Sequence, residues 1–169
     1  MLKFALVGCG RIAKRHSELL GFNKIKNASL VAVCDINEKR AKKISDQFNL
    51  PYYIDMDEMM QKQSIDVVSV LTESGNHAKH VINLAKYGKH LVVEKPLALT
   101  LSDADLMIKT CNENDCKLFI IKQNRFNLPV IKLRQAYEQG RFGKLVLGTV
   151  RVRWSRNQDY YDQDKWRGT

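Results

Sequence analysis

The sequence predicts an α/β fold: a Rossmann doubly wound parallel sheet over residues 1–121, then the truncated start of an α+β domain over residues 122–169. In the first part, strands that are apolar throughout alternate with helical segments, as in a parallel sheet buried between two helix layers. In the second part, one helix precedes one strand of alternating apolar and polar residues. One helix and one strand cannot bury a core, so we expect the second domain to be incomplete at residue 169.

Short apolar runs predict the strands of the first domain, and apolar residues spaced three and four apart predict its helices. Asn37 and Ser102 carry side chains that can cap two of these helices. The expected strands cover residues 4–7, 30–34, 51–54, 67–71, 91–93 and 118–121, and the expected helices cover residues 11–20 and the neighbourhoods of 41–48, 78–85 and 104–111.

The second domain begins with a predicted helix, because Pro129 suits the first turn of a helix that runs to about Gln139. Over residues 145–154 the pattern changes to alternation. Val150 falls on an apolar face and Arg151 on the opposite one, which predicts a half-exposed strand.

The composition is that of a globular protein, with 44% hydrophobic and 27% charged residues. No apolar run approaches the roughly 20 residues that span a bilayer, and the first residues run directly into a strand without a signal peptide. The four cysteines lack the spacing of a zinc site. We therefore expect reduced thiols, no metal site, no membrane association and a cytoplasmic protein.

The net charge of +10 is concentrated in the second part, which carries 11 Lys and Arg against 4 Asp and Glu. A basic surface suits nucleic acid, a membrane or a small polyanion. No nucleic-acid-binding motif accompanies the charge, so nucleic acid is not expected as a partner. The alternatives are a small anionic ligand, a solvated face, or a face that acidic residues elsewhere neutralise.

Gly8, Gly10 and Ala13 form a G-x-G-x-x-A pattern between the first strand and the first helix. In this context the first glycine allows a tight turn, the second lets the backbone approach a pyrophosphate, and the small third residue allows close packing. Asp35 ends the second strand, where an acid binds the ribose hydroxyls. Together they predict a dinucleotide site that favours NAD over NADP, although Lys39 and Arg40 lie nearby.

Glu94, Lys95 and Pro96 follow directly on the strand at 91–93. Strand ends line the ligand crevice of a doubly wound sheet, so Lys95 is placed to exchange a proton with a substrate hydroxyl. A surface lysine after a strand is an equally good interpretation of the local pattern.

The glycine motif, Asp35 and the stretch over residues 88–97 resemble the glucose–fructose oxidoreductase and inositol dehydrogenase family (Gfo/Idh/MocA). Residues 122–127, 153–161 and 166–169 resemble the branch of that family that oxidises C3 of UDP-N-acetylglucosaminuronate or UDP-N-acetylglucosamine. The family usually has Thr-Pro after the fourth strand, where this chain has Thr72 and Glu73.

The resemblance implies roles for individual residues. Lys95 is the implied catalytic residue, and His16 is expected only to pack or cap. The implied cofactor-binding residues are Gly8, Gly10, Arg11, Ile12, Asp35, Thr72, Ser74, His77, Glu94, Lys95 and Gln123, and the implied substrate-binding residues are Asn124, Arg156, Tyr160 and Arg167.

The resemblance further implies an NAD-dependent oxidoreductase that takes a hydride from C3 of a UDP-linked N-acetylamino sugar or its uronate. Such enzymes serve surface-polysaccharide and lipopolysaccharide biosynthesis. The first unit would bind NAD, and the second would open a substrate and oligomerisation domain whose sheet forms a homo-oligomer. The family's second catalytic pair would lie after residue 169, so we expect the 169-residue chain alone to be inactive. The alternative is a truncated, non-catalytic dinucleotide-binding module.

Overall fold

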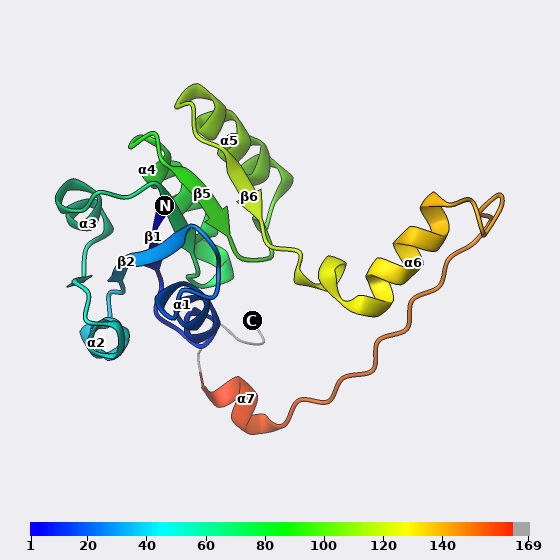
Figure 1. The fold of residues 1–169 in the computed structure, drawn as a ribbon, viewed down its shortest axis with the longest axis horizontal. Coiled ribbons are helices and arrows are strands. Elements are labelled where there is room, and N and C mark those ends of the chain that lie inside the picture. The colour runs from blue at the N-terminus through cyan, green and yellow to red at the C-terminus, as the bar shows by residue number, and fades with distance from the viewer. Residues whose placement is uncertain (164–169) are drawn as a thin grey trace. The chain divides into compact units, whose positions relative to one another are not determined.

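In the computed structural model, which describes residues 1–163, six parallel strands form one sheet in the order β3-β2-β1-β4-β5-β6 (Figure 1). Strand order runs outward from β1 in one direction and from β4 in the other, so the topological switch point lies between these two strands. This order confirms the predicted Rossmann fold. The strands are β1 (Leu2–Val7), β2 (Ala28–Cys34), β3 (Tyr52–Tyr53), β4 (Val67–Val70), β5 (His90–Val93) and β6 (Leu118–Ile120).

Helices cover both faces of this sheet. Leu6 packs toward α1 and α2, whereas its neighbours Ala5 and Val7 pack toward α3, α4 and α5. Because both faces are buried, the central strands are mostly apolar, as the sequence pattern indicated; the polar exceptions include Lys3 of β1, Ser69 of β4 and His90 of β5. The helices are α1 (Ala13–Gly21), α2 (Glu38–Phe48), α3 (Met56–Lys62), α4 (His77–Ala85) and α5 (Leu101–Glu113), with a short 3-10 helix η1 (Ser74–Asn76) before α4.

The helix caps differ in part from the prediction. Asn37 caps α2, as expected, by accepting a hydrogen bond from the Arg40 backbone N–H. The expected cap Ser102 is wrong, because the cap lies two residues earlier, where Thr100 accepts the hydrogen bond from the Asp103 N–H. Helix α3 was not predicted; it is capped by Asp55 and buries two methionines against the sheet.

The chain divides into two units, Met1–Ile121 and Lys122–Thr169. The second contains a 3-10 helix η2 (Gln123–Phe126), α6 (Leu128–Glu138) with Pro129 in its first turn, and α7 (Gln158–Asp162). Helix α6 confirms the helix expected from Pro129, and α7 was not predicted. No helix among residues 1–163 is both long enough and apolar enough to cross a membrane.

The strand expected over residues 145–154 is absent from the structure. This segment has no regular secondary structure, and every residue of it is exposed. Val150 on the expected apolar face is 89% exposed. Alternation is a condition for a half-buried strand, but a strand also needs a neighbour for its backbone hydrogen bonds. Within the described residues this segment has no such neighbour.

Candidate functional site

The candidate site lies where the central strands end. Val7 is in register with Cys34 of β2 and with Val70 of β4, and Val70 is in register with Val93 of β5. The residues that follow these strands therefore lie along one edge of the sheet. In a doubly wound fold, ligands bind at this edge beside the switch point.

Gly8 occupies the turn after β1 and has a backbone φ of +96°. A side-chain Cβ at this position would lie 2.8 Å from the carbonyl group of Leu71 and from the backbone nitrogen of Thr72. No other residue fits, because both the conformation and the space require glycine. The glycine turn thus lies directly against the turn after β4, across the switch point.

Gly10 has a different environment, because a Cβ built there would meet nothing within 4 Å. Arg11 and Ile12 are exposed in the same turn, and Ala13 is fully buried at the start of α1. The residue that precedes this helix, Ile12, offers no side chain as a cap. An open approach to backbone N–H groups at a helix N-terminus fits the pyrophosphate of a dinucleotide.

Asp35 follows β2 and uses both carboxylate oxygens to hold the backbone. Its Oδ2 accepts a hydrogen bond from the Cys9 N–H at 2.6 Å, and its Oδ1 accepts one from the Asn37 N–H at 2.8 Å. Each carboxylate oxygen has a second lone pair, so both can still accept from hydroxyl groups. Asp35 is half-buried beside the glycine turn, which fits the ribose of NAD.

Cys9 lies between the two glycines, and its thiol is buried. Burial, together with the nearby charge of Asp35, raises the pKa of this thiol to about 12. The thiol therefore stays protonated and is unreactive at neutral pH.

The turn after β4 carries Thr72, Ser74 and His77. The Thr72 hydroxyl lies 2.9 Å from Nδ1 of His80, and both ring nitrogens of His77 lie within hydrogen-bonding distance of backbone carbonyl oxygens. Burial lowers the pKa of His80. Thr72 and Ser74 are half-buried, whereas the His77 side chain is fully buried.

Glu94 and Lys95 follow β5 at the same edge. Glu94 is buried; its Oε2 accepts a hydrogen bond from the Lys95 N–H at 3.0 Å, and its Oε1 lies 3.5 Å from Nε2 of His16 on α1. Burial acts to raise the pKa of Glu94, but His16 and the Lys95 N–H outweigh it and hold that pKa below its usual value. Lys95 itself is exposed.

Two residues of this edge were not expected from sequence. His16 was expected only to pack or cap, yet it pairs with Glu94; His80 holds Thr72. For His16 a local signal exists, because it lies one helical turn after the buried Ala13 and so faces the sheet side of α1. No comparable signal identifies His80.

The remaining predicted residues belong to the second unit. Gln123 and Asn124 are exposed in η2. Arg156 lies over the rings of Trp154 and Tyr160, each 5.0 Å from the ring centroid. The structure therefore brings Arg156 and Tyr160 together, and Arg167 lies outside the described residues.

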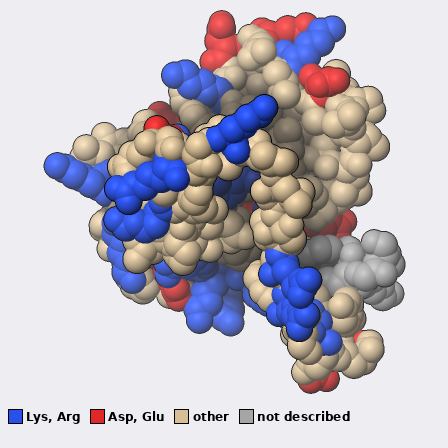
Figure 2. Space-filling view, turned by 90° about the vertical axis from the view of Figure 1, so that its right-hand side faces the viewer, with Lys and Arg blue, Asp and Glu red and all other residues tan. Residues whose placement is uncertain are grey.

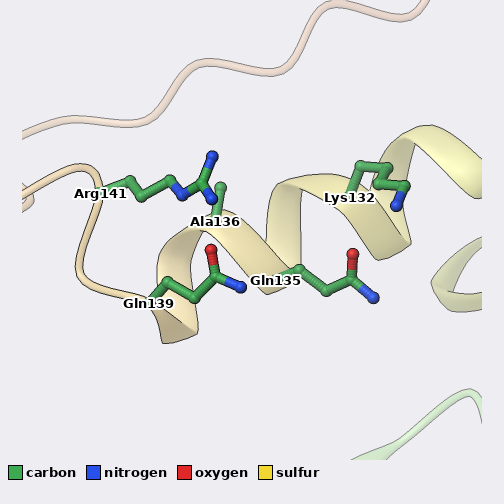
Figure 3. Close-up of a pocket in the computed structure, with 5 residues that line it drawn as sticks. All are labelled: Lys132, Gln135, Ala136, Gln139 and Arg141. Atoms are coloured by element: carbon green, nitrogen blue, oxygen red, sulfur yellow. The ribbon is translucent and has the colours of Figure 1, made fainter.

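Other surface features of residues 1–163 add no predicted residue to this site. A shallow hollow on α6, lined by Lys132, Gln135, Ala136, Gln139 and Arg141, contains none of the predicted residues (Figure 3). Lys and Arg are spread over the face shown in Figure 2 rather than gathered in one patch. Residues 1–163 contain no group of three or more His, Cys, Asp or Glu side chains that could hold a metal ion.

The strand order, the glycine turn and the acid after β2 define a dinucleotide-binding domain of the Rossmann class. Residues 2–122 match the family profile described as "Oxidoreductase family, NAD-binding Rossmann fold". The chain belongs to this family, Gfo/Idh/MocA, as the resemblance indicated.

Similar proteins include an inositol dehydrogenase and two dehydrogenases solved with a bound nucleotide sugar. The chain is 34% identical over 144 residues to a myo-inositol 2-dehydrogenase of Thermotoga maritima, covering 85% of this chain and 42% of that protein. Two crystal structures of WlbA dehydrogenases were solved in complex with NADH and UDP-GlcNAcA.

The WlbA dehydrogenase from Bordetella pertussis is 37% identical with a TM-score of 0.93, and the one from Chromobacterium violaceum is 36% identical with a TM-score of 0.94. Each match covers 99% of this chain but only 51% and 48% of those proteins. The chain thus spans about half the length of the relatives it matches.

Proposed function

We propose that this chain is the cofactor-binding half of an NAD-dependent dehydrogenase that oxidises C3 of a UDP-linked N-acetylamino sugar or its uronate. The observation that carries the proposal is the similarity over 99% of the chain to the two WlbA dehydrogenases, whose complexes hold NADH and UDP-GlcNAcA. The myo-inositol dehydrogenase is similar over a smaller share of the chain. The sugar and its position of oxidation are therefore proposed from the WlbA similarity.

The chain's own residues hold the cofactor in this proposal. The open space at Gly10 and the N-terminus of α1 receive the pyrophosphate, and Asp35 accepts hydrogen bonds from the adenosine ribose. A carboxylate repels a 2′-phosphate, so NAD is preferred to NADP. Arg11, Ile12, Thr72, Ser74, His77, Glu94 and Gln123 complete the proposed cofactor-binding set.

Lys95 is the proposed catalytic residue. Its side chain is exposed at the end of β5, on the same edge of the sheet as the glycine turn. When bound, NAD supplies the acceptor for the hydride that leaves C3. Lys95 takes the proton of the 3-hydroxyl as that bond breaks, so the alcohol becomes a ketone.

The second unit is proposed to contribute residues that bind the sugar substrate. The UDP-sugar would be bound by Asn124, Arg156, Tyr160 and Arg167. The guanidinium of Arg156 already lies over the ring of Tyr160. A guanidinium recognises a diphosphate or a carboxylate through paired hydrogen bonds, which suits both parts of a UDP-uronate. We also propose that the full-length protein forms a homo-oligomer through the sheet of the substrate domain that this unit begins.

The second candidate is a non-catalytic module that binds NAD and turns nothing over. It is favoured by the coverage of only about half of each relative, since an enzyme of this class must hold the sugar against the cofactor. One proton-transfer group contributes about 10²–10⁴-fold without that positioning. The 169-residue chain alone is therefore proposed to bind NAD but to turn over slowly or not at all.

The test measures the absorbance of NADH formed from NAD with UDP-N-acetylglucosaminuronate or UDP-N-acetylglucosamine as substrate. It is run on this chain and on the protein expressed from the full coding sequence that contains it. Turnover by the longer protein, lost in Lys95→Ala and kept in Lys117→Ala, supports the dehydrogenase. Lys117 is a matched control because it is exposed before β6, at the other edge of the sheet. A longer protein that binds NADH but oxidises neither sugar overturns the proposed substrate.

A further inference from the structure

His77 opens α4 and links the two turns that follow the neighbouring strands β4 and β5. Its Nε2 lies 3.0 Å from the carbonyl oxygen of Thr72, and its Nδ1 lies 2.7 Å from the carbonyl oxygen of Pro96. Pro96 is the residue after Lys95. The side chain is only 1% exposed, so both ring nitrogens depend on these protein partners.

The chemistry of the partners restricts the ring. Carbonyl oxygens accept hydrogen bonds but do not donate them, so each contact takes one ring N–H. A neutral imidazole has a single N–H, and its other nitrogen would point a lone pair at a carbonyl lone pair. Both hydrogen bonds form together only when the ring is the doubly protonated imidazolium.

We propose that His77 is a positioning residue that, as an imidazolium, holds the turn carrying Lys95 against the turn carrying Thr72. The inference rests on the function proposed for Lys95. It adds His77 as a residue that acts on Lys95 through the backbone of the neighbouring Pro96. Two charge-assisted hydrogen bonds offset part of the cost of burying the charge.

The charged and titratable groups nearest in sequence to these contacts come from three elements. Glu73 follows Thr72, Glu94 and Lys95 precede Pro96, and Lys79 and His80 lie on α4 with His77. His80 is a separate contact, because it pairs with the Thr72 hydroxyl rather than with its carbonyl. His77 is thus the side chain that joins the two turns through their backbones.

The contacts predict a local effect when His77 is replaced. The Glu94 N–H donates to the Val70 carbonyl at 3.0 Å as part of the sheet, so β5 stays in place without His77. The residues after β5, including Lys95, lose the hydrogen bond between His77 and the Pro96 carbonyl. Opening is expected in the two turns rather than in the whole domain.

The first experiment is ¹⁵N NMR of the histidine rings in the unaltered 169-residue chain at neutral pH, with His77→Phe used to assign the resonance. Two protonated ring nitrogens on His77 are expected. One protonated and one bare nitrogen overturns the proposal. This readout needs neither NAD nor turnover, and a residue that only fills space gives no such signature.

The second experiment compares His77→Gln and His77→Phe, with His90→Gln as the matched control. His90 is at the opposite end of β5, where its Nδ1 accepts a hydrogen bond from the Lys117 N–H. The N–H groups of Asn76 and Lys95 in these turns are hydrogen-bonded, to the Glu73 carbonyl and to Glu94 Oε2. In His77→Phe we expect faster amide exchange at Asn76 and Lys95 and a Kd for NADH raised about tenfold, the scale of one hydrogen bond to a charged group. The Gln amide keeps N–H donors, so His77→Gln should recover part of both effects.

The outcomes separate this inference from the proposed function. Equal exchange at Asn76 and Lys95 in His77→Phe and the unaltered chain overturns the role of His77, whatever the enzyme does. If the unaltered chain fails to bind NADH, the proposed function fails while NMR and exchange still test His77. If His77→Phe and His77→Gln change amide exchange and NADH affinity equally, the argument that His77 acts as a hydrogen-bond donor is wrong.

Discussion

The Oε1 atom of Glu94 lies 3.5 Å from the Nε2 atom of His16. This contact joins the end of β5, next to Lys95, to the helix that follows the glycine turn. Both side chains are largely buried, and the other Glu94 oxygen accepts the Lys95 N–H. The proposed pyrophosphate-binding and proton-transfer parts of the site are therefore linked through one carboxylate.

This pair predicts an acid-dependent loss of stability. The pKa of folded Glu94 is lowered, so its stabilising contribution is fully present above the pKa of an unfolded glutamate, about 4.3. That contribution is lost as the pH falls through the lower folded value. Urea denaturation across this range should show a smaller pH dependence in Glu94→Gln than in the unaltered chain. Glu113→Gln, an exposed control on α5, should keep the original dependence.

The two glycines of the motif should respond differently to alanine. Gly8→Ala places a Cβ 2.8 Å from backbone atoms of the β4 turn at a positive φ, so the free energy of unfolding should fall by about 1–3 kcal/mol or more. Gly10→Ala meets nothing within 4 Å and should leave stability nearly unchanged.

Binding should separate the same two variants. Because the space at Gly10 is proposed to receive the pyrophosphate, Gly10→Ala should raise the Kd for NADH about tenfold, equivalent to about 1.4 kcal/mol. Denaturation and calorimetry measure both effects. Unchanged NADH affinity in Gly10→Ala would place the pyrophosphate elsewhere.

Asp35 is predicted to set the preference for NADH over NADPH. Asp35→Ala removes the acceptor for the ribose and the repulsion of a 2′-phosphate. The Kd for NADPH divided by the Kd for NADH should therefore fall about tenfold. The variant also loses the bond to the Cys9 N–H, so both affinities should decrease somewhat. Asp66→Ala is the matched control, because Asp66 accepts the Lys3 N–H at the other edge of the sheet. Tighter binding of NADPH than NADH by the unaltered chain would contradict the assignment.

The exposed segment over residues 145–154 predicts self-association of the isolated chain. Val146, Val150 and Trp154 are largely exposed, and an uncovered apolar segment tends to pair with another copy. Sedimentation should show oligomers that Val150→Lys weakens more than Thr149→Lys, which adds the same charge at an exposed neighbour. A stable monomer at high concentration would show that this surface does not drive association.

Local pattern accounts for most of the fold. All six strands, helices α1, α2, α4, α5 and α6 and the glycine turn were predicted because each depends on residues close together in the chain. The strand predicted over residues 145–154 was wrong, because a strand requires a pairing partner that a local pattern does not supply. Helix α3 and the Thr100 cap were missed because the segments are short and their signals compete with neighbouring residues.

The sequence by itself determined the class of fold, the place of the dinucleotide turn and the family, because apolar periodicity and the glycine spacing are properties of consecutive residues. Only the tertiary structure decided which distant groups meet: Cys9 with Asp35, His16 with Glu94, and His77 with the carbonyls of Thr72 and Pro96. The physical reason is that strand register and helix packing set these distances, and neither is encoded within a single element.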